Sequence, residues 1–298
     1  MASKYKSLAA LGLSTTLLGG LVACGNEVET TPAPTETAAA EDTDTAATQT
    51  PDAQTDTSSY PMSGGEGEGG EGEGGEGEGG EGGVDLAAAA QDPAVYRSAL
   101  AMTEAHIRAG IDALDAGERR AAGEMFAHPV SEILLDFEPV LVQQGVEPFA
   151  QKLSDASAAV FAEESAEDLR ARADDIIETL RAAAEKAPEG SDSDAVVEAK
   201  VIADQINRAT AQYGSATGTD AYEPYLDGYG FYSTANALLE DHRAAIEADA
   251  PDFVEQADAV LAILADAYPT ADRPETLEAD QSAMTAGNSE LQLIVSGL

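Results

Sequence analysis

A repeat rich in glycine and glutamate, in the first third of the chain, most limits where a folded domain can form. The unit Glu-Gly-Glu-Gly-Gly occurs three times in succession from Glu66, and a shortened copy ends at Gly83. Before the repeat, residues 27–60 are rich in Thr, Ala, Pro and acidic side chains. Such sequences bury too little apolar surface to offset the conformational entropy that ordering removes. We therefore predict a disordered tether over residues 24–83 and a folded domain over residues 84–298.

The chain is strongly acidic, with a net charge of −41. Residues 25–83 carry 15 acidic side chains and no Lys or Arg, whereas residues 84–298 carry 41 acidic and 13 basic side chains. Such a protein repels nucleic acids and anionic lipid headgroups, so we exclude both as partners. An alternative interpretation of the repeat is that its carboxylates bind cations such as Ca²⁺. Flexible carboxylates bind Ca²⁺ weakly when no cage holds them, which favours a solvated tether.

Residues 84–298 show the periodicity of amphipathic helices and no sustained two-residue alternation. Asp92 before Pro93 is a typical helix start, and Ser165 with Asp168 resembles a capping box. Pro129 is expected to interrupt the second helix because it lacks a backbone donor. The sequence thus predicts an all-α fold, a single bundle of about seven helices. They cover residues 93–115, 118–144, 147 onward, 165 onward, a segment around 202–213, 222–247 and 251 onward, with a short helix at 275–286 in the tail.

The amino terminus has the organisation of a lipoprotein signal peptide. Lys4 and Lys6 precede an apolar and hydroxylated run over residues 8–22, which is too short to span a bilayer as a mature helix. The run leads into Leu21-Val22-Ala23-Cys24, which resembles the lipobox of bacterial lipoproteins, and Cys24 is the only cysteine. This resemblance implies that residues 1–23 are removed and that Cys24 carries acyl chains such as palmitate. Two or more acyl chains anchor a protein stably in a membrane.

The same resemblance implies a location in the cell envelope. The residue after Cys24 is Gly25 rather than Asp, which implies the outer membrane if the organism has two membranes. The alternatives are an ordinary signal peptide that releases a soluble protein, and an anchor that is not cleaved. Because its one thiol is acylated in this interpretation, the domain forms no internal disulfide and depends on its own hydrophobic core.

Three histidines, His106, His128 and His242, lie on three different predicted helices. Glu132 follows His128 by four residues, which places both side chains on one helix face. Three imidazoles and a carboxylate would suit zinc, iron, copper or haem. A helical wheel places His242 in the core and His106 at the edge of the apolar stripe of its helix. It places His128 and Glu132 on the face opposite the apolar stripe of their helix. In the alternative interpretation, His242 is a core residue, His106 a surface residue and His128 a helix-start residue, and no shared site exists.

A second cluster consists of tyrosines on the predicted helix over residues 222–247. Phenol groups on one helix face can ligate Fe³⁺, stack on sugar rings, or pack with their hydroxyls at the edge of the core, which is the commonest arrangement. Gly228 and Gly230 lie among them and weaken helix propensity, which predicts close packing or a local break. The tyrosines of the cluster are Tyr222, Tyr225, Tyr229 and Tyr232.

The chain contains no phosphate-binding loop, no serine-hydrolase elbow and no His-Glu-x-x-His zinc-protease motif. The pair His128-Pro-Val-Ser-Glu132 resembles the His-x-x-Glu signature of imelysin-like periplasmic proteins linked to iron uptake. In this chain the pair is one residue longer and follows Ala127 instead of glycine. The resemblance implies iron as a candidate ligand.

The leading hypothesis is a non-enzymatic lipoprotein that binds a metal ion or haem through His106, His128, Glu132 and His242. The alternative is an envelope lipoprotein that presents its acidic surface to a protein partner and has no metal site. An enzyme such as a hydrolase is a third hypothesis, and no motif supports it. Convergence of the histidines would favour the first hypothesis over the second.

Overall fold

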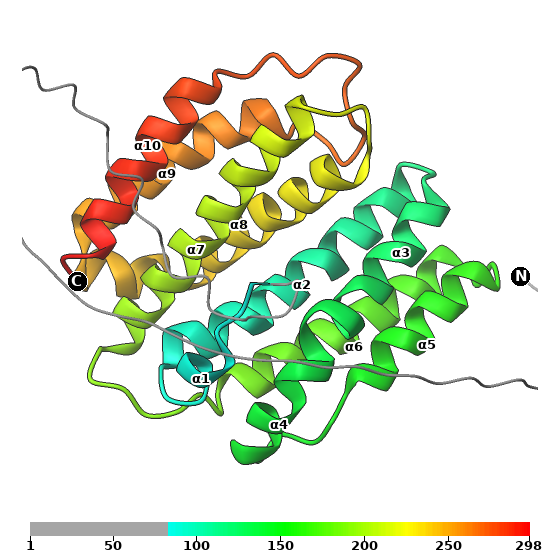
Figure 1. The fold of residues 1–298 in the computed structure, drawn as a ribbon, viewed down its shortest axis with the longest axis horizontal. Coiled ribbons are helices and arrows are strands. Elements are labelled where there is room, and N and C mark those ends of the chain that lie inside the picture. The colour runs from blue at the N-terminus through cyan, green and yellow to red at the C-terminus, as the bar shows by residue number, and fades with distance from the viewer. Residues whose placement is uncertain (1–82) are drawn as a thin grey trace, which may run out of the picture. The chain divides into compact units, whose positions relative to one another are not determined.

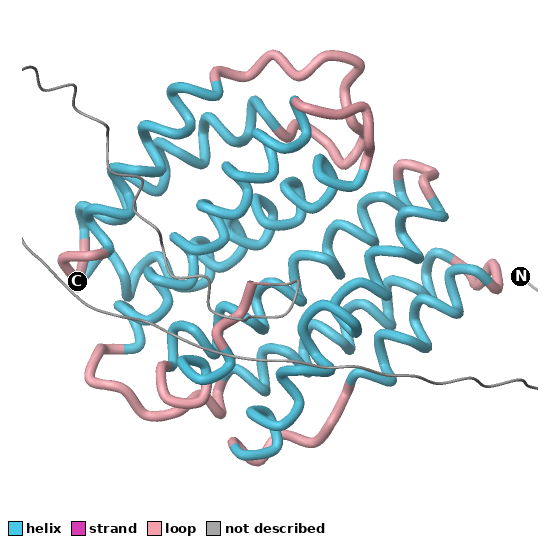
Figure 2. Tube along the Cα trace, in the orientation of Figure 1, coloured by secondary structure: helices cyan, strands magenta, loops and turns pink. Residues whose placement is uncertain are grey.

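The computed structural model describes residues 83–298. The predicted signal peptide, Cys24 and the predicted tether up to residue 82 lie outside the described residues. Within residues 83–298 every regular element is a helix and no strand occurs, so the predicted all-α fold class is confirmed (Figure 2). None of these helices combines the length and the apolar character that crossing a membrane requires.

The helices follow the predicted segments, with one short helix added at the start. The predicted segment over residues 118–144 consists of two α-helices joined by a π-helix. The elements are α1 (Leu86–Ala89), α2 (Pro93–Asp115), α3 (Arg119–Pro129), η1 (Val130–Leu134), α4 (Leu135–Gln143), α5 (Ala150–Phe161), α6 (Ala166–Ala184), α7 (Asp194–Thr217), α8 (Glu223–Asp249), α9 (Pro251–Ala267) and α10 (Gln281–Val295).

The helix ends have local causes that are visible in the sequence. The Asp92 carboxylate accepts hydrogen bonds from the first backbone N–H groups of α2, and Pro93 occupies the first helical position. The Ser165 hydroxyl accepts a hydrogen bond from the backbone N–H of Asp168, as the capping box predicts. Gly117 after α2 and Gly145 after α4 have positive φ angles of 91° and 75°, which glycine adopts without strain.

The predicted bounds of the tail helix are wrong. The helix was expected over residues 275–286, but α10 begins at Gln281 and runs to Val295. Asp280 determines this start, because its carboxylate accepts a hydrogen bond from the backbone N–H of Ala283. Met284 and Leu291 lie two turns apart on the same face of α10, and both are buried. The apolar face of α10 therefore extends beyond the predicted end of the helix.

Helix α2 occupies the centre of the bundle (Figure 1). It contacts α3 and α6 on one side and α7 and α8 on the other, while α9 and α10 pack on α7 and against each other. Tyr96, Leu100 and Ile107 of α2 are almost completely buried between these groups. Because of this central position, polar residues of α2 such as Glu104 and His106 are buried against neighbouring helices.

Helices α2 and α8 approach so closely that their backbones almost touch. A β-carbon at Gly230 would overlap the carbonyl oxygen of Ala105 and would lie 3.0 Å from the Cβ of Ala109. A β-carbon at Gly228 would likewise overlap the phenol oxygen of Tyr268. The two glycines therefore serve close packing and do not break the helix. The contact brings α8 directly beside His106.

Substituting Gly230 by Ala should lower the free energy of unfolding by about 1–3 kcal/mol, because the added methyl group overpacks a backbone contact. The loss should outweigh the gain in helix propensity of roughly 1 kcal/mol. Urea denaturation measures the difference. The matched control is Gly218→Ala at the end of α7, where a β-carbon meets only the carbonyl oxygen of Ser215 at 3.4 Å. Equal stability of the two variants would contradict close packing at Gly230.

Candidate metal centre

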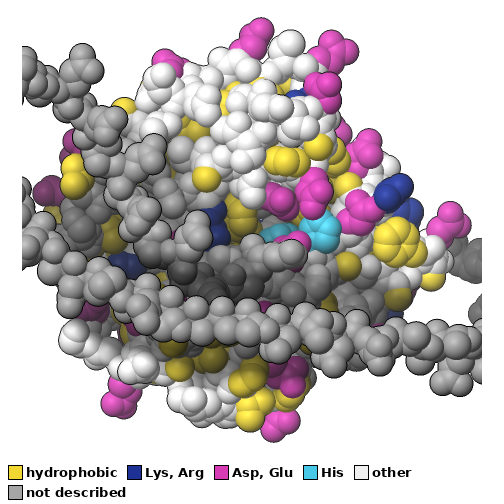
Figure 3. Space-filling view, viewed as in Figure 1, with side chains coloured by type: hydrophobic (Ala, Val, Ile, Leu, Met, Phe, Trp, Pro, Cys, Tyr) yellow, Lys and Arg dark blue, Asp and Glu magenta, His cyan; other side chains and the backbone are white. Residues whose placement is uncertain are grey.

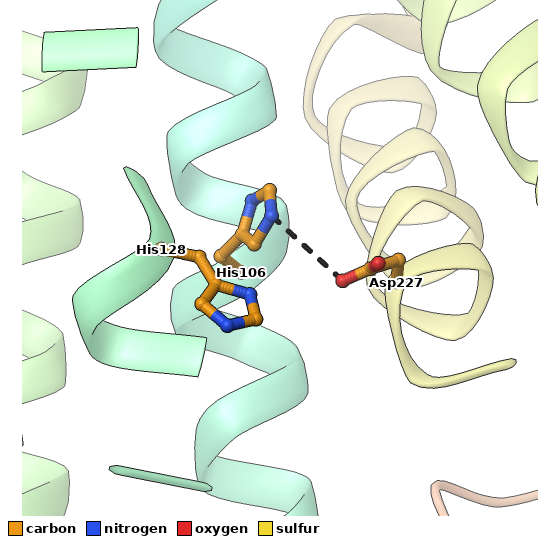
Figure 4. Close-up of side chains that lie close together, drawn as sticks. All are labelled: His106, His128 and Asp227. Carbon is orange, nitrogen blue, oxygen red and sulfur yellow. Dashed lines mark ion pairs between the residues drawn. The ribbon is translucent and has the colours of Figure 1, made fainter. Parts of the chain in front are cut away.

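Three side chains from three helices meet where α2, α3 and α8 come together: His106, His128 and Asp227. One potential ligand atom from each lies within 4.8 Å of the other two (Figure 4). The two imidazole centroids are 6.2 Å apart. The structure thus brings together two of the three histidines and adds a carboxylate that sequence reasoning had not singled out.

His106 is buried and held in one orientation. Its side chain is 6 % exposed. Its Nδ1 lies 2.8 Å from the carbonyl oxygen of Met102, one turn earlier in α2, so that Nδ1–H donates to this carbonyl. The lone pair of the neutral ring is then on Nε2, which faces Glu132 and Asp227 at 3.7 and 3.8 Å. Burial lowers the pKa of His106, which favours the neutral ring that binds metals.

Glu132 lies between the two histidines. Its Oε2 is 3.7 Å from Nε2 of His106, and its Oε1 is 3.9 Å from Nδ1 of His128. His128 is the penultimate residue of α3, whereas Glu132 lies in η1, the π-helical turn that follows Pro129. Single π-helical turns inside α-helices occur frequently at functional sites. Here the turn carries the carboxylate that faces both imidazoles.

Asp227 on α8 supplies a buried carboxylate without a partner. Among the described residues its Oδ1 has no hydrogen-bond partner, although this atom is fully buried. Burial is the main cause that raises the pKa of Asp227 to about 7. The nearby carboxylates of Glu223 and Glu132 act in the same direction, and His128 opposes them. An unpaired buried acceptor destabilises a fold unless something binds it. A cation between Asp227 and His106 would satisfy it.

The chemistry of the group fits a transition-metal ion. Two imidazoles with carboxylates form a mixed nitrogen and oxygen donor set, which suits zinc, iron and copper better than magnesium or calcium. Tetrahedral ligands with bonds of about 2.0–2.2 Å lie roughly 3.3–3.6 Å apart. The separations of 3.7–3.9 Å between the ring nitrogens and the carboxylate oxygens are close to this value. Small side-chain movements would therefore complete a coordination sphere.

The edge of the site is open to water on the side of His128. The side chain of His128 is 23 % exposed, and Glu223 at the start of α8 is 62 % exposed, with its Oε1 3.7 Å from Nδ1 of His128. Figure 3 shows histidine side chains reaching the surface on this face, bordered by acidic side chains. A site with negative charges at its opening attracts cations.

His242 does not belong to this group. It follows Asp227 by fifteen residues on the same helix, which is a separation of about 22 Å along the axis. The prediction that His242 points into the core is wrong, because its side chain is 41 % exposed and its Nε2 lies 3.8 Å from Oε2 of Glu198. His242 lies beside a cavity that Leu238 and Asp241 also line, whereas Leu239 and Ile246 of the same apolar stripe are buried. The prediction that His106 lies at an edge is also wrong, since it is buried.

The tyrosine cluster of α8 is used in packing. Tyr225 donates a hydrogen bond to the carbonyl oxygen of Thr270, and Tyr229 donates one to the Asp112 carboxylate. Tyr232 stacks on Tyr268 at a centroid distance of 6.1 Å. Burial raises the pKa of Tyr225 and of Tyr229 above the usual value of a phenol, so both groups stay neutral donors. The phenolate that Fe³⁺ binds is disfavoured at both positions.

Sequence reasoning missed Asp227, although a signal existed. Asp227 occupies a position of the apolar stripe of α8, at the spacing that continues to Phe231, Thr234 and Leu238. An acidic residue on a core-facing stripe is rarely left unpaired. That pattern marks Asp227 as a candidate once α8 is assigned as a helix.

In comparisons with known proteins, no family model, no curated protein and no solved structure matches this chain.

Proposed function

We propose that this chain is a lipid-anchored protein of the cell envelope whose helical domain binds a single transition-metal ion and catalyses no reaction. His106, His128 and Asp227 would be the ligands, and Glu132 would be either a fourth ligand or the acceptor that orients the two imidazoles. The observation that carries the proposal is the convergence of these groups around the unpartnered buried oxygen of Asp227. Iron, zinc and copper all suit the donor set.

An ion fits this site better than haem does. Haem needs an apolar slot for its ring beside the axial histidine. Here the carboxylates of Glu132 and Asp227 both lie within 4 Å of Nε2 of His106, in the space that the ring would occupy. Negative charge at this position favours a bare cation.

Metal content tests the proposal on the full chain. The protein is treated with chelator, incubated separately with Zn²⁺, Cu²⁺ and anaerobic Fe²⁺, desalted, and analysed by mass spectrometry. We expect one equivalent of at least one of these metals in the wild type and close to none in the double variant His106→Ala, His128→Ala. Weakly bound ions on flexible acidic residues are removed by desalting. Equal metal content in the two proteins would exclude this site.

The proposed anchor is tested independently of the metal. When the chain is expressed in a bacterial host supplied with radiolabelled palmitate, the wild type should incorporate the label, since Cys24 stands in a lipobox-like sequence. Cys24→Ser should remain unlabelled and should leave the membrane fraction. Labelling that persists after this substitution would contradict acylation at Cys24.

One observation favours the alternative of a protein-interaction lipoprotein. Leu135 and Val142 lie two turns apart on α4 and are 60 % and 54 % exposed, in a domain with a strongly acidic surface. Large exposed apolar side chains of this kind are found at contacts between proteins. This alternative becomes the better proposal if the wild type binds none of the three metals.

A further inference from the structure

A cavity lies on the opposite face of α2 from the candidate metal centre. This cavity, of about 270 Å³, opens between α2, α6, α7 and α8. It is lined on the α2 side by Leu100 and Glu104, and Glu104 lies about 200° around the helix from His106. The cavity is close in size to the smaller ligand pockets of proteins.

The walls of the cavity are apolar and its rim is charged. Leu100, Leu180, Val201 and Leu238 form an aliphatic lining, and no Phe, Tyr or Trp is among the residues that line the cavity. Four carboxylates and two guanidinium groups surround this lining, which leaves two negative charges in excess when His242 is neutral. The charged residues are Arg97, Glu104, Arg181, Glu185, Glu198 and Asp241.

Two of these carboxylates are buried, and they differ in how they are paired. Glu104 is 4 % exposed and is fully engaged, because it accepts hydrogen bonds from Arg108 and Arg181. Glu198 is 10 % exposed, and its Oε1 accepts a hydrogen bond of 2.7 Å from Arg97. Within residues 83–298 its Oε2 accepts no hydrogen bond, and His242 Nε2 lies 3.8 Å away. A largely buried carboxylate at the cavity therefore has one oxygen that accepts no hydrogen bond and has the His242 ring as a neighbour at 3.8 Å.

We infer that this cavity binds a small organic ammonium ion, a primary amine with a short aliphatic body. The ammonium group would donate a hydrogen bond to Oε2 of Glu198, and its charge would offset part of the excess negative charge of the lining. The aliphatic body would lie against Leu100, Val201 and Leu238. A quaternary ammonium is a poorer ligand, because it has no N–H to donate and the cavity has no aromatic cage.

Three matched probes test this assignment on the full chain. Hexylamine, 1-hexanol and hexanoate share an aliphatic body and differ in the charge of the head group. At pH 7.5 an alkylamine is protonated, because this pH is roughly three units below the pKa of an alkyl ammonium such as that of Lys. Isothermal titration calorimetry at this pH should show saturable binding of hexylamine at one site. Hexanol should bind at least about tenfold more weakly, and hexanoate should not bind. Equal binding of all three probes, preferred binding of hexanoate, or no binding of hexylamine would each overturn the inference.

Two variants locate the site. Glu198→Gln keeps an acceptor for Arg97 and removes the charge, so hexylamine should lose at least about tenfold in affinity and bind no better than hexanol. Since this variant also weakens a buried ion pair, Ala184→Phe provides a second test, because it fills the cavity and keeps every charge. It should abolish binding of hexylamine. Glu290→Gln, on the exposed face of α10, is the matched control and should bind hexylamine as the wild type does.

This inference does not depend on the metal centre. His106→Ala, which removes a proposed metal ligand, should bind hexylamine with unchanged affinity. Retained metal binding in Ala184→Phe, together with lost hexylamine binding, would separate the two sites. If hexylamine binding persists in both Glu198→Gln and Ala184→Phe, the amine binds elsewhere and the inference is wrong.

Discussion

Substituting His106 by Ala should lower the affinity of the full chain for Zn²⁺ by roughly 100-fold or more. His106 is the most deeply buried candidate ligand, and its hydrogen bond to the Met102 carbonyl already fixes the ring with Nε2 toward the carboxylates. A pre-oriented ligand contributes strongly to affinity, and loss of even an outer-shell partner typically weakens metal binding 10–100-fold. Competition titration with a chromophoric zinc chelator measures the affinity over this range.

The matched control is His242→Ala, which removes the same side chain on α8 about 22 Å from Asp227 along the helix axis. This variant should bind Zn²⁺ as the wild type does. Circular dichroism serves to check that both variants are folded. If His242→Ala weakens Zn²⁺ binding as strongly as His106→Ala does, the metal centre is not the group around Asp227.

Substituting Asp227 by Asn should stabilise the metal-free chain at pH 8 by roughly 2–4 kcal/mol, while it removes a proposed metal ligand. Burial raises the pKa of Asp227 from 3.8 to about 7. Between these two values the folded state retains a proton that the unfolded state has lost. The contribution to stability is therefore complete below about pH 3.8 and disappears as the pH rises through 7. Asn cannot ionise, so the variant should lack this pH dependence.

Urea denaturation in the presence of chelator, at pH 5 and at pH 8, measures the effect. The difference in unfolding free energy between the variant and the wild type should be larger at pH 8 than at pH 5. Excess Zn²⁺ at pH 8 should stabilise the wild type and have little effect on the variant, since a ligand that binds only the folded state raises its stability. Asp266→Asn removes an exposed carboxylate of α9 and serves as the control. Identical pH dependence in Asp227→Asn and the wild type would show that Asp227 is not buried as an acid.

The helices could be predicted from the sequence because their causes are local. Asp92 with Pro93 and Ser165 with Asp168 mark helix starts within a few residues. At Pro129 the predicted interruption is a change from α-helix to a π-helical turn, and the segment stays helical. The π-helical turn after Pro129 was not predictable in this way. In this turn Ile133 and Leu134 are buried in the core, whereas Glu132 faces the histidines.

The metal centre could be predicted only in part, because it depends on which helices pack together. The His128 and Glu132 pair was found from spacing within one helix segment. Local periodicity cannot show that α2 is central, so it could not show that His106 is buried and turned toward α8. Nor could it show that His242 lies beside a cavity and stays partly exposed. Asp227 was not predicted because the tyrosines are the most conspicuous feature of residues 222–247, and acidic residues are common throughout the chain.

The solvent exposure of Glu223, His128 and His106 indicates a route by which an ion would enter the metal centre. Exposure falls from 62 % at Glu223 through 23 % at His128 to 6 % at His106. An ion arriving from solvent would thus exchange its waters stepwise, for the outer carboxylate first and for the inner imidazole last. An ion that leaves would follow the reverse route. A protein that receives the ion would have to dock at the amino end of α8.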